Sequence, residues 1–161
     1  MTTDNFRVGL GFDSHRIESG GTMILGGVPI ECDAHLVGHS DADALLHAIT
    51  DAILSAAGLD DIGQLFPNTD PSNKNRDSGE MLAFAVEAVR REGYRVVNID
   101  CVVHSEKPKV SAYKLAMRMR IAELLGVSID RVGLKGKTGE RSGEIGAGRL
   151  MEVHCVALLT R

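Results

Sequence analysis

An aspartate and a histidine lie two residues apart near the start of the chain, in the run Gly11-Phe12-Asp13-Ser14-His15. Residues two apart in a β-strand project from the same face, so a strand here predicts that both side chains point the same way. A third candidate ligand, His47, lies in the downstream run that begins His39-Ser40-Asp41. Two imidazoles and one carboxylate, with no fourth ligand nearby, are typical of an open zinc site rather than a closed structural one.

The segment around His47 adds a predicted anion-binding feature. Ser40-x-x-Asp43 resembles a capping box, so we expect a helix to begin near Ser40, about two turns before His47. Backbone N–H groups at such a helix start attract phosphate, and here they would lie beside His39. Asp51, one turn beyond His47, is predicted to bond the spare ring nitrogen of that histidine. An Asp-x-His pair also arises by chance, and its coincidence with this helix start favours a metal site.

The composition indicates an ordinary globular protein that binds a small anion. The 161 residues fit a single domain over 1–161, and 43% hydrophobic with 25% charged residues is typical of soluble proteins. The net charge of −4 argues against a general nucleic-acid-binding surface. The basic groups are instead concentrated at Lys107, Lys109, Lys135, Lys137 and Arg141, and such local clusters suit a small anionic ligand.

The cysteines and the first residues of the chain indicate in which cellular compartment the protein is expected. Cys32, Cys101 and Cys155 show no C-x-x-C spacing, and an odd number argues against a disulfide framework. Cys101 and Cys155 lie in apolar runs and are predicted to be buried free thiols. No run approaches the roughly 18 apolar residues of a membrane span, and the first residues lack the pattern of a signal peptide. We therefore expect a cytoplasmic protein with no membrane partner.

Hydrophobic patterning predicts strands that alternate with helices. Strands are predicted over 6–15, 94–104, 131–138 and 151–160, with a short hairpin over 23–30, and helices over 41–57, 77–92 and 110–125. Residues 59–76 and the Gly-rich stretch 139–148 are predicted to be irregular, and a loop as long as 59–76 is usually functional or mobile. This order predicts an α/β (α+β) fold, with helices packed on one side of a mixed β-sheet.

The last strand predicts an oligomer. The apolar run from Val153 to Leu159 requires cover on both faces. Three helices on a chain this short are not expected to cover every strand face, so we expect a closed cyclic oligomer in which strand faces pack against other subunits. His104 and His154 lie in predicted strands and are interpreted as structural residues.

Further motifs follow in a characteristic order. They are Asp61-Ile62-Gly63, Leu65-Phe66-Pro67-Asn68-Thr69-Asp70-Pro71, Pro108-Lys109 and Lys135-x-Lys137-Thr138-x-Glu140. With the two runs above, they make the chain resemble, along essentially its whole length, the 2-C-methyl-D-erythritol 2,4-cyclodiphosphate synthase family of the non-mevalonate isoprenoid pathway. The resemblance implies a homotrimer whose sheets face the three-fold axis and whose active sites lie between neighbouring subunits.

The resemblance also implies the reaction. A phosphorus–oxygen lyase of this family converts 4-diphosphocytidyl-2-C-methyl-D-erythritol 2-phosphate to 2-C-methyl-D-erythritol 2,4-cyclodiphosphate and releases CMP. The nucleophile is the substrate's own 2-phosphate, so no serine or cysteine nucleophile is needed. The implied cofactors are Zn²⁺ and a second divalent cation, Mg²⁺ or Mn²⁺, because two phosphates that repel each other must be brought together.

Two other functions stay open on the residues alone. One is a zinc-dependent nucleotide phosphodiesterase or hydrolase that uses metal-bound water. The chain has no H-E-x-x-H motif and no obvious carboxylate base beside the predicted metal, which argues against this alternative. The other is a non-catalytic nucleotide-binding module with a structural metal, and the missing fourth ligand argues against it.

Residue roles follow from the same resemblance. Asp13, His15 and His47 match the zinc ligands, and Glu140 matches the ligand of the second cation. His39 and Thr138 match the catalytic pair that helps to hold the reacting phosphates. The implied substrate contacts also include Asp13, His15 and Ser40 near the metal, then Asp61, Ile62, Gly63, Phe66, Pro67, Asn68, Thr69 and Asp70 around the sugar, then Ser105, Lys107, Pro108 and Lys109 at the cytidine diphosphate, and finally Lys137, Gly139 and Glu140.

The chain departs from the family pattern at two places. A Thr-Thr-Thr-Glu run that is frequent in the family is Lys137-Thr138-Gly139-Glu140 here. A Phe and an Arg that are common a few positions further on are matched by Glu144 and Ala147. The Thr and the Glu are retained, so the implied catalysis stands. The resemblance therefore does not carry over the contacts of the lost Phe and Arg, nor an anionic-ligand site on the trimer axis that depends on that Arg.

Overall fold

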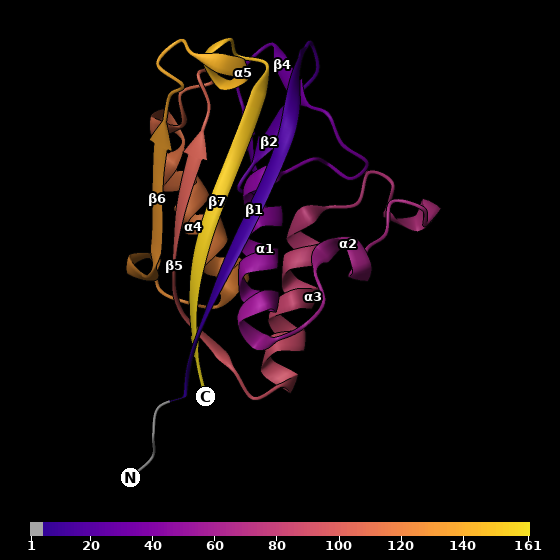
Figure 1. Cartoon of the computed structure of the whole chain (residues 1–161), viewed down its shortest axis with the longest axis vertical. Helices are drawn as coiled ribbons and strands as arrows, with labels where there is room; N and C mark the ends of the chain where they lie inside the picture. The colour runs from indigo at the N-terminus through magenta and orange to yellow at the C-terminus, as the bar shows by residue number, and fades with distance from the viewer. Residues whose placement is uncertain (1–4) are drawn as a thin grey trace.

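A five-stranded sheet forms the centre of the computed structural model, which describes residues 5–161 (Figure 1). Its strand order is β4-β1-β7-β5-β6, and only the β5–β6 pair is parallel, so the sheet is mixed. The strands are β1 (Phe6–Ser19), β4 (Ala34–Leu36), β5 (Arg95–His104), β6 (Val132–Lys137) and β7 (Leu150–Thr160). A separate hairpin pairs β2 (Met23–Leu25) with β3 (Val28–Ile30), as the sequence predicted.

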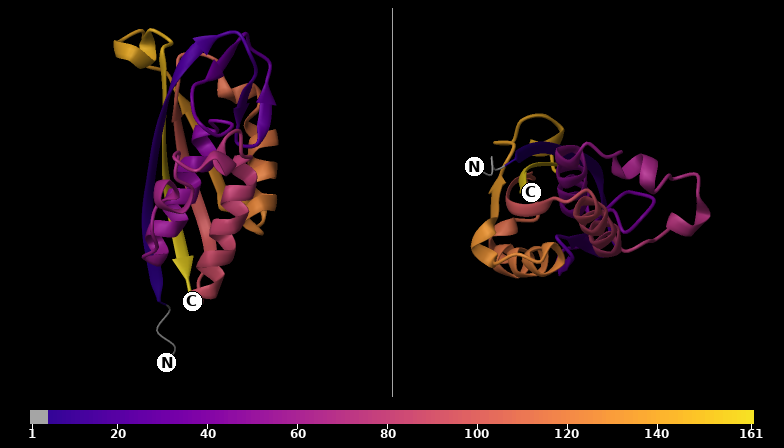
Figure 2. Two further views of the ribbon diagram at one scale, coloured as in Figure 1. Left: turned by 90° about the vertical axis from the view of Figure 1, so that its right-hand side faces the viewer. Right: turned by 90° about the horizontal axis from the view of Figure 1, so that it is seen from below.

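Three long helices cover one face of this sheet, and Figure 2 shows that they lie on the same side of the strands. They are α1 (Ala44–Ala57), α3 (Ser78–Arg91) and α4 (Lys114–Leu125). The shorter helical segments are α2 (Ile62–Leu65), α5 (Gly143–Gly146) and 3-10 turns at Pro71–Asn73, Val110–Ala112 and Ile129–Arg131. The predicted arrangement of helices on one side of a mixed sheet is therefore confirmed. Within the described residues, no helix is long and apolar enough to cross a membrane.

The core between helices and sheet is mainly aliphatic. Leu45, Ile49, Ala52, Ile53 and Ala56 form a buried apolar stripe on α1, and Gly58 ends that helix with a positive φ of 75°. Every second residue is buried from Ile99 to Val103 on β5 and from Met151 to Leu159 on β7, and these residues include Cys101 and Cys155. All three cysteines are free. The prediction of two buried thiols is confirmed.

Several element boundaries differ from the sequence prediction. Strand β1 continues to Ser19, and residues 59–76 are not wholly irregular, because they contain α2 and a 3-10 turn. Helix α5 lies inside the Gly-rich stretch, and strand β4 was not predicted. Each of these unpredicted elements is three or four residues long. That is too short for a period of 2 or 3.6 to show in the sequence.

The start of α1 is set by Asp43 rather than by Ser40. The Asp43 side chain is fully buried and accepts hydrogen bonds from the N–H of Leu46 at 3.0 Å, Gly26 at 2.9 Å and Gly27 at 2.6 Å. Burial raises the pKa of Asp43 to about 6 despite these three donors. The prediction that the helix begins near Ser40 was therefore wrong. The helix begins at Ala44, because the Asp43 carboxylate both caps it and binds the hairpin turn at Gly26 and Gly27.

Replacing Asp43 with alanine should destabilise the fold strongly. The change removes a helix cap and leaves the buried N–H groups of Gly26 and Gly27 without an acceptor, at a cost of about 3 kcal/mol or more in the free energy of unfolding. Urea unfolding measures this loss. The matched control is Asp77→Ala, which removes an exposed cap that serves only α3. Equal losses in the two variants would contradict the tie between the hairpin and α1.

The sheet face opposite the helices exposes large apolar side chains. Phe6, Val8, Leu10 and Phe12 project from β1, and Val156 projects from β7 beside Leu10. Their exposed fractions lie between 48% and 69%. The sequence predicted an uncovered strand face on β7, and the structure places most of the exposed apolar surface on the adjoining β1. Such a contiguous apolar face is typical of an interaction surface.

Candidate active site and its family

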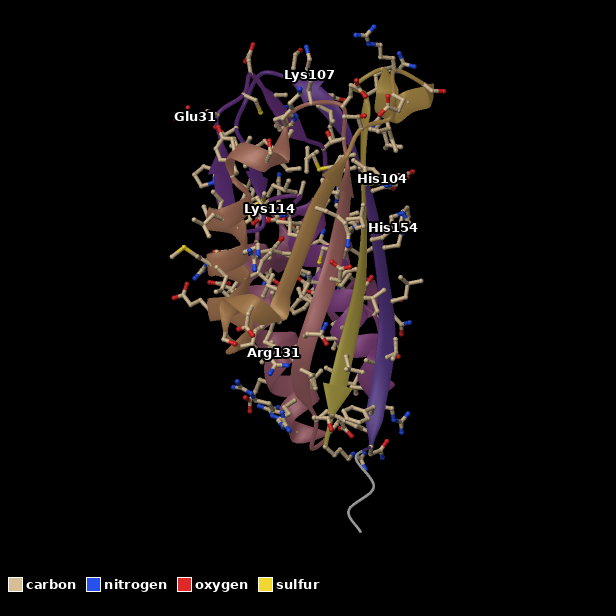
Figure 3. All side chains as sticks on the ribbon, turned by 90° about the vertical axis from the view of Figure 1, so that its left-hand side faces the viewer. Glu31, His104, Lys107, Lys114, Arg131 and His154 are labelled. Atoms are coloured by element: carbon tan, nitrogen blue, oxygen red, sulfur yellow. The ribbon has the colours of Figure 1, made fainter. Side chains whose placement is uncertain are left out.

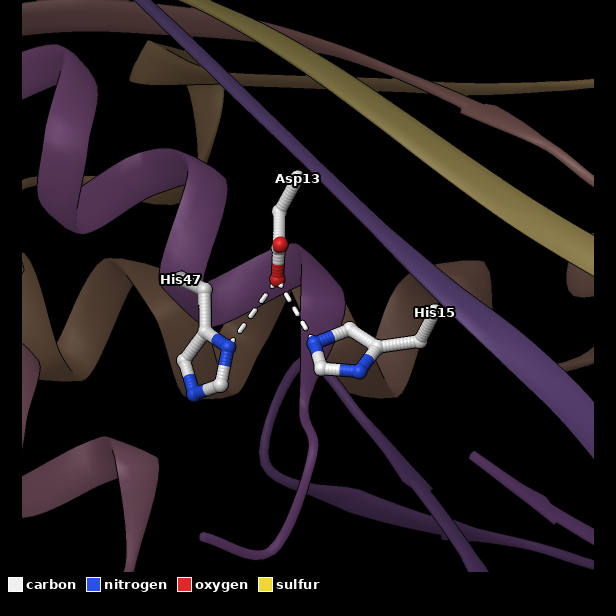
Figure 4. Close-up of side chains that lie close together, drawn as sticks. All are labelled: Asp13, His15 and His47. Atoms are coloured by element: carbon white, nitrogen blue, oxygen red, sulfur yellow. Dashed lines mark hydrogen bonds and ion pairs between the residues drawn. The ribbon is translucent and has the colours of Figure 1, made fainter. Parts of the chain in front are cut away.

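Asp13, His15 and His47 converge at one point, as Figure 4 shows. Asp13 Oδ2 lies 2.9 Å from His15 Nε2 and 3.0 Å from His47 Nδ1. One ligand atom from each residue lies within 4.8 Å of the others. The structure thus brings together the three side chains that the sequence predicted as zinc ligands, two from β1 and one from the first turn of α1.

Two glycines allow β1 and α1 to approach closely enough for this contact. A Cβ atom on Gly11 would lie 1.8 Å from the carbonyl oxygen of Ala48, and one on Gly9 would lie 2.0 Å from that of Ala52. Both distances are far below van der Waals contact, so only glycine fits at these positions. The glycine of the Gly11-Phe12-Asp13 motif therefore has a packing role, because it lets the His47 helix lie against the strand that carries Asp13.

Hydrogen bonds on the far side of each ring fix which nitrogen faces Asp13. His15 Nδ1 lies 2.7 Å from the carbonyl oxygen of Val37, which can only accept, so this nitrogen carries the proton. His47 Nε2 lies 2.8 Å from Ser78 Oγ, and that hydroxyl donates its own proton to Asp41. Ser78 therefore accepts from His47 Nε2–H. In the neutral rings, a lone pair of each histidine points at Asp13 Oδ2.

This donor set fits a divalent metal ion. Two imine nitrogens and a carboxylate oxygen face one another, and a cation or additional protons must lie between them. The residues match a three-ligand zinc site that keeps one position open. When additional protons rather than an ion lie between these groups, burial raises the pKa of Asp13, but hydrogen bonds from the protonated His15 and His47 rings outweigh it and lower that pKa to about 2. Burial likewise lowers the pKa of His15, and the Asp13 carboxylate more than reverses this.

Asp51 does not bond His47, which corrects the sequence prediction. Its Oδ1 accepts instead from the N–H of Ile62 at 2.8 Å and so holds the start of α2. His47 lies in the first turn of α1. Its ring therefore lies beside two hydroxyl groups near the start of that helix, Ser40 in the preceding loop and Ser78 at the start of α3. Ser78 was missed because the sequence offers no signal for it beyond a serine at a helix start.

Replacing Ser78 with alanine should weaken the site without unfolding the protein. The change removes the closer of the two hydroxyls at His47 Nε2, Ser78 Oγ at 2.8 Å, and leaves Ser40 Oγ at 3.2 Å, so the ring can more easily present the wrong nitrogen to Asp13. Loss of such an outer hydrogen bond typically costs about 10- to 100-fold in metal affinity or activity. Zinc affinity and kcat measure the effect. Ser55→Ala, an exposed serine on α1, is the matched control, and equal values for both variants would contradict the role.

A pocket of about 370 Å³ opens beside the three ligands. His39 lines it, and His39 Nε2 is buried with no hydrogen-bond partner among the described residues. Of the residues predicted around the sugar, Ile62, Gly63, Phe66 and Asn68 also line the pocket. The Arg76 guanidinium stacks on Phe66 at 4.8 Å and supports this wall. An unpartnered buried ring nitrogen in a pocket is suited to bind a ligand oxygen.

Asp61, Pro67 and Asp70, also predicted sugar contacts, have structural partners in their own loop. Asp61 caps α2 and accepts from the N–H of Gln64, and Asp70 caps the next 3-10 turn. The Pro67 carbonyl accepts from the Asn73 side chain at 3.0 Å. Pro67, Thr69 and Asp70 do not line the pocket beside the metal ligands. Their contacts with substrate stay predictions.

A second pocket, of about 380 Å³, lies beside β6, at the opposite edge of the sheet. It is lined by Ser105, Lys109, Lys137 and Thr138, all predicted substrate contacts, together with Lys114 and Lys135. Lys107 and Pro108 line an adjoining cavity that Lys109 also reaches. Lysines around a half-apolar hollow suit a phosphorylated nucleoside. Lys135 is already paired with Asp100 at 2.5 Å, whereas Lys109, Lys114 and Lys137 form no ion pair with any residue in the described part of the chain, 5–161.

The predicted catalytic pair is not brought together within one chain. His39 lines the first pocket and Thr138 the second, and the two pockets share no residue. In Figure 1 the β1 and β6 strands lie toward opposite edges of the sheet. Thr138 donates to Glu140 at 3.0 Å. Glu140 belongs to no cluster of three metal-binding side chains in residues 5–161, and Gly139 donates its N–H to Glu106.

Glu144 and Ala147 are the positions where the Phe and the Arg of the family pattern are missing. Glu144 forms a two-pronged ion pair with Arg149, with N–O distances of 2.6 and 2.8 Å. The pair is exposed and closes the short turn around α5. A charged pair thus stands where an apolar ring is common, and Ala147 offers no positive charge to an anion.

Comparison with known proteins covers the whole folded chain. The model of the YgbB family matches residues 6–160. A 2-C-methyl-D-erythritol 2,4-cyclodiphosphate synthase of Gemmatimonas aurantiaca is 52% identical over 87% of this chain and 84% of its own. A protein of that name from Dechloromonas aromatica is 48% identical over 98% of both chains.

A solved structure agrees with these relatives. The Plasmodium falciparum IspF in complex with CDP superposes with a TM-score of 0.86 at 32% identity, over 99% of this chain and 98% of that one. The match thus extends to the arrangement of the elements that carry Asp13, His15 and His47. With a family model that spans all but the ends of the sequence, and relatives about half identical throughout, the chain belongs to the YgbB family.

Proposed function

We propose that this chain catalyses the metal-dependent cyclisation of 4-diphosphocytidyl-2-C-methyl-D-erythritol 2-phosphate. The products are 2-C-methyl-D-erythritol 2,4-cyclodiphosphate and CMP, which makes the enzyme a phosphorus–oxygen lyase. The observation that carries the proposal is the cluster of Asp13, His15 and His47 in a chain whose full-length relatives are named as this synthase. The CDP complex of a structural neighbour supports a cytidine nucleotide as ligand.

The reaction forms one bond and breaks one. An oxygen of the 2-phosphate attacks the β-phosphorus of the cytidine diphosphate group, and the bond from that phosphorus to the bridging oxygen breaks. CMP leaves with the bonding electron pair. The β-phosphate is thereby closed into a ring with the 2-phosphate, and no water is consumed. The protein must hold two anionic groups together and stabilise the charge that develops on the leaving oxygen.

The residues of this chain can supply both functions. Zinc held by Asp13, His15 and His47 would act as a Lewis acid toward phosphate oxygens. His39 lines the same pocket, and its Nε2, which has no partner among the described residues, can donate to a phosphate oxygen. Ser40 offers a hydroxyl at the pocket rim. Lys109 and Thr138 from the second pocket would bind the diphosphate of the leaving CMP, and Glu140 would hold Mg²⁺ or Mn²⁺ there.

A complete site requires two chains under this proposal. The metal half lies beside β1 and α1. The nucleotide half lies beside β6, at the opposite edge of the sheet. When the β6 side of one chain meets the β1 side of the next, the contact joins unlike surfaces, and such contacts close into rings. The exposed apolar face of β1 and β7 supplies surface to bury in the ring. We therefore propose a homotrimer with sheets facing a three-fold axis.

Turnover in ¹⁸O-labelled water tests the reaction class. Cyclisation takes its nucleophilic oxygen from the substrate, so the purified chain with zinc and Mg²⁺ should give unlabelled CMP and unlabelled cyclodiphosphate by mass spectrometry. A zinc-dependent phosphodiesterase would place ¹⁸O in a product phosphate. Labelled product, or no turnover of this substrate, would refute the proposal.

A further inference from the structure

A second cluster of metal-binding side chains lies outside the proposed active site. His104 on β5 and Glu152 and His154 on β7 each place a ligand atom within 4.8 Å of the others. Figure 3 shows His104 and His154 side by side on adjacent strands, on the face of the sheet turned away from α1. All three side chains are half-buried. The sequence interpretation of these histidines as merely structural leaves this arrangement unexplained.

Strand register determines this arrangement. In the antiparallel β5–β7 pair, His104 lies directly opposite Glu152, and His154 lies opposite Val102, two residues along the same face. Opposed and diagonal residues on one face bring long side chains into contact. The ring centroids of His104 and His154 are 5.8 Å apart. Because both strands are central in the sheet, these backbone positions are rigidly held.

Within one chain, the rest of the fold gives these side chains no other partner, and the homotrimer proposed above would turn their face of the sheet toward the three-fold axis. Among residues 5–161, no side chain of the three takes part in a hydrogen bond or ion pair at the distances that define such contacts. Phe12 packs on the other side of His154, with ring centroids 4.9 Å apart. Phe12 therefore limits how far that ring can turn while offering it no polar atom. A carboxylate and two imidazoles held together without protein partners can all bind one ion.

We propose that His104, Glu152 and His154 bind one divalent transition-metal ion per chain, at a site separate from Asp13, His15 and His47. Two imidazoles and one carboxylate are a ligand set found in zinc enzymes, and imidazole favours Zn²⁺, Co²⁺ or Ni²⁺ over Mg²⁺ or Ca²⁺. Three protein ligands leave a coordination position open. This site lies on the opposite face of the sheet from the proposed catalytic pocket and does not depend on the proposed reaction.

The first experiment isolates the new site in the full-length chain. The double variant Asp13→Ala/His47→Ala removes the other cluster, so zinc that binds after chelator treatment and dialysis reports on the remaining one. Isothermal titration with ZnCl₂ should give one equivalent per chain. Adding His154→Gln or Glu152→Gln should weaken this binding at least about tenfold, because each removes one of three ligands. The matched control is His35→Gln, a half-buried histidine that belongs to neither cluster.

Cobalt provides an independent readout that does not require the double variant. Wild-type protein loaded with Co²⁺ should bind two equivalents per chain, with visible absorption bands from both sites, and His154→Gln or His104→Gln should each bind one. Circular dichroism checks that the variants fold, and sedimentation checks that they keep the oligomeric state of the wild type, because all three residues lie on the sheet face proposed to pack in the ring. No zinc binding by the Asp13→Ala/His47→Ala chain, or binding that the Glu152→Gln and His154→Gln changes leave unaltered, would overturn the proposal. Cyclisation activity should persist in His154→Gln, so this result is separable from the test of the reaction.

Discussion

Replacing His47 with alanine is expected to lower turnover at least about a thousandfold and to remove one equivalent of bound zinc per chain. The His47 ring contributes one of three ligands, and Asp13 and His15 alone leave an ion with too few protein donors. Loss of Lewis-acid stabilisation worth several kcal/mol corresponds to a rate loss of this size, since each 1.4 kcal/mol is about tenfold. Steady-state CMP release and metal analysis of the same sample measure the two effects.

A control separates this loss from a general effect of removing a histidine. His35→Ala removes a half-buried histidine whose Nδ1 contacts the carbonyl oxygen of Gly20 at 2.8 Å, away from both metal clusters. It should retain its zinc and its turnover. The His47→Ala variant should also retain its oligomeric state in sedimentation, because His47 is not on the exposed sheet face. Wild-type turnover by His47→Ala with one zinc fewer would refute the catalytic role of this cluster.

Mixing two inactive variants is expected to restore activity if the site is shared between chains. Asp13→Ala destroys the metal half of the site, and Lys109→Ala/Thr138→Val destroys the nucleotide half. Each variant alone lacks one half of every site. In a mixed ring, a chain with an intact metal half can meet a neighbour with an intact nucleotide half. Joint denaturation and refolding of the two variants allows such rings to form.

The size of the recovery distinguishes shared sites from sites within one chain. With equal amounts and random assembly, about one quarter of the sites receive both intact halves, so activity should return to about a quarter of the wild-type value. A site built within one chain would give no recovery at any ratio. Each variant refolded alone is the control, and the ratio of the two chains should move the recovery through a maximum at equal amounts. Absence of recovery, with mixed rings shown by mass spectrometry, would contradict the shared site.

The sequence predicted the long elements well because their hydrophobic patterns extend over many residues. The three long helices and the main strands were placed within a few residues, and the hairpin at Gly26-Gly27 was identified. The start of α1 was placed too early because Ser40 and Asp43 are both good caps. Local sequence does not say which of them is buried against the hairpin turn. Asp43 is, and its contacts with Gly26 and Gly27 join residues distant in sequence.

The candidate site was predicted in part. The types and spacing of Asp13, His15 and His47 indicated a metal site, and the structure brings the three together. The partner of His47 could not be predicted, because Ser78 reaches it through tertiary packing of α3 against α1. Asp51 has helical spacing from His47, yet its carboxylate is used by α2. Spacing within one helix gives neighbours but not the direction in which a ring turns.

By itself, the sequence determined which residue types are available and where the regular elements run, because these depend on side-chain chemistry and local periodicity. It also carried enough family motifs to indicate the reaction. Only the tertiary structure decided that Gly9 and Gly11 bring α1 against β1. It also decided that the His39 and Thr138 pockets lie toward opposite edges of the sheet, and that His104 faces Glu152. These relations depend on strand register and on packing between distant segments, and no local pattern in the chain encodes them.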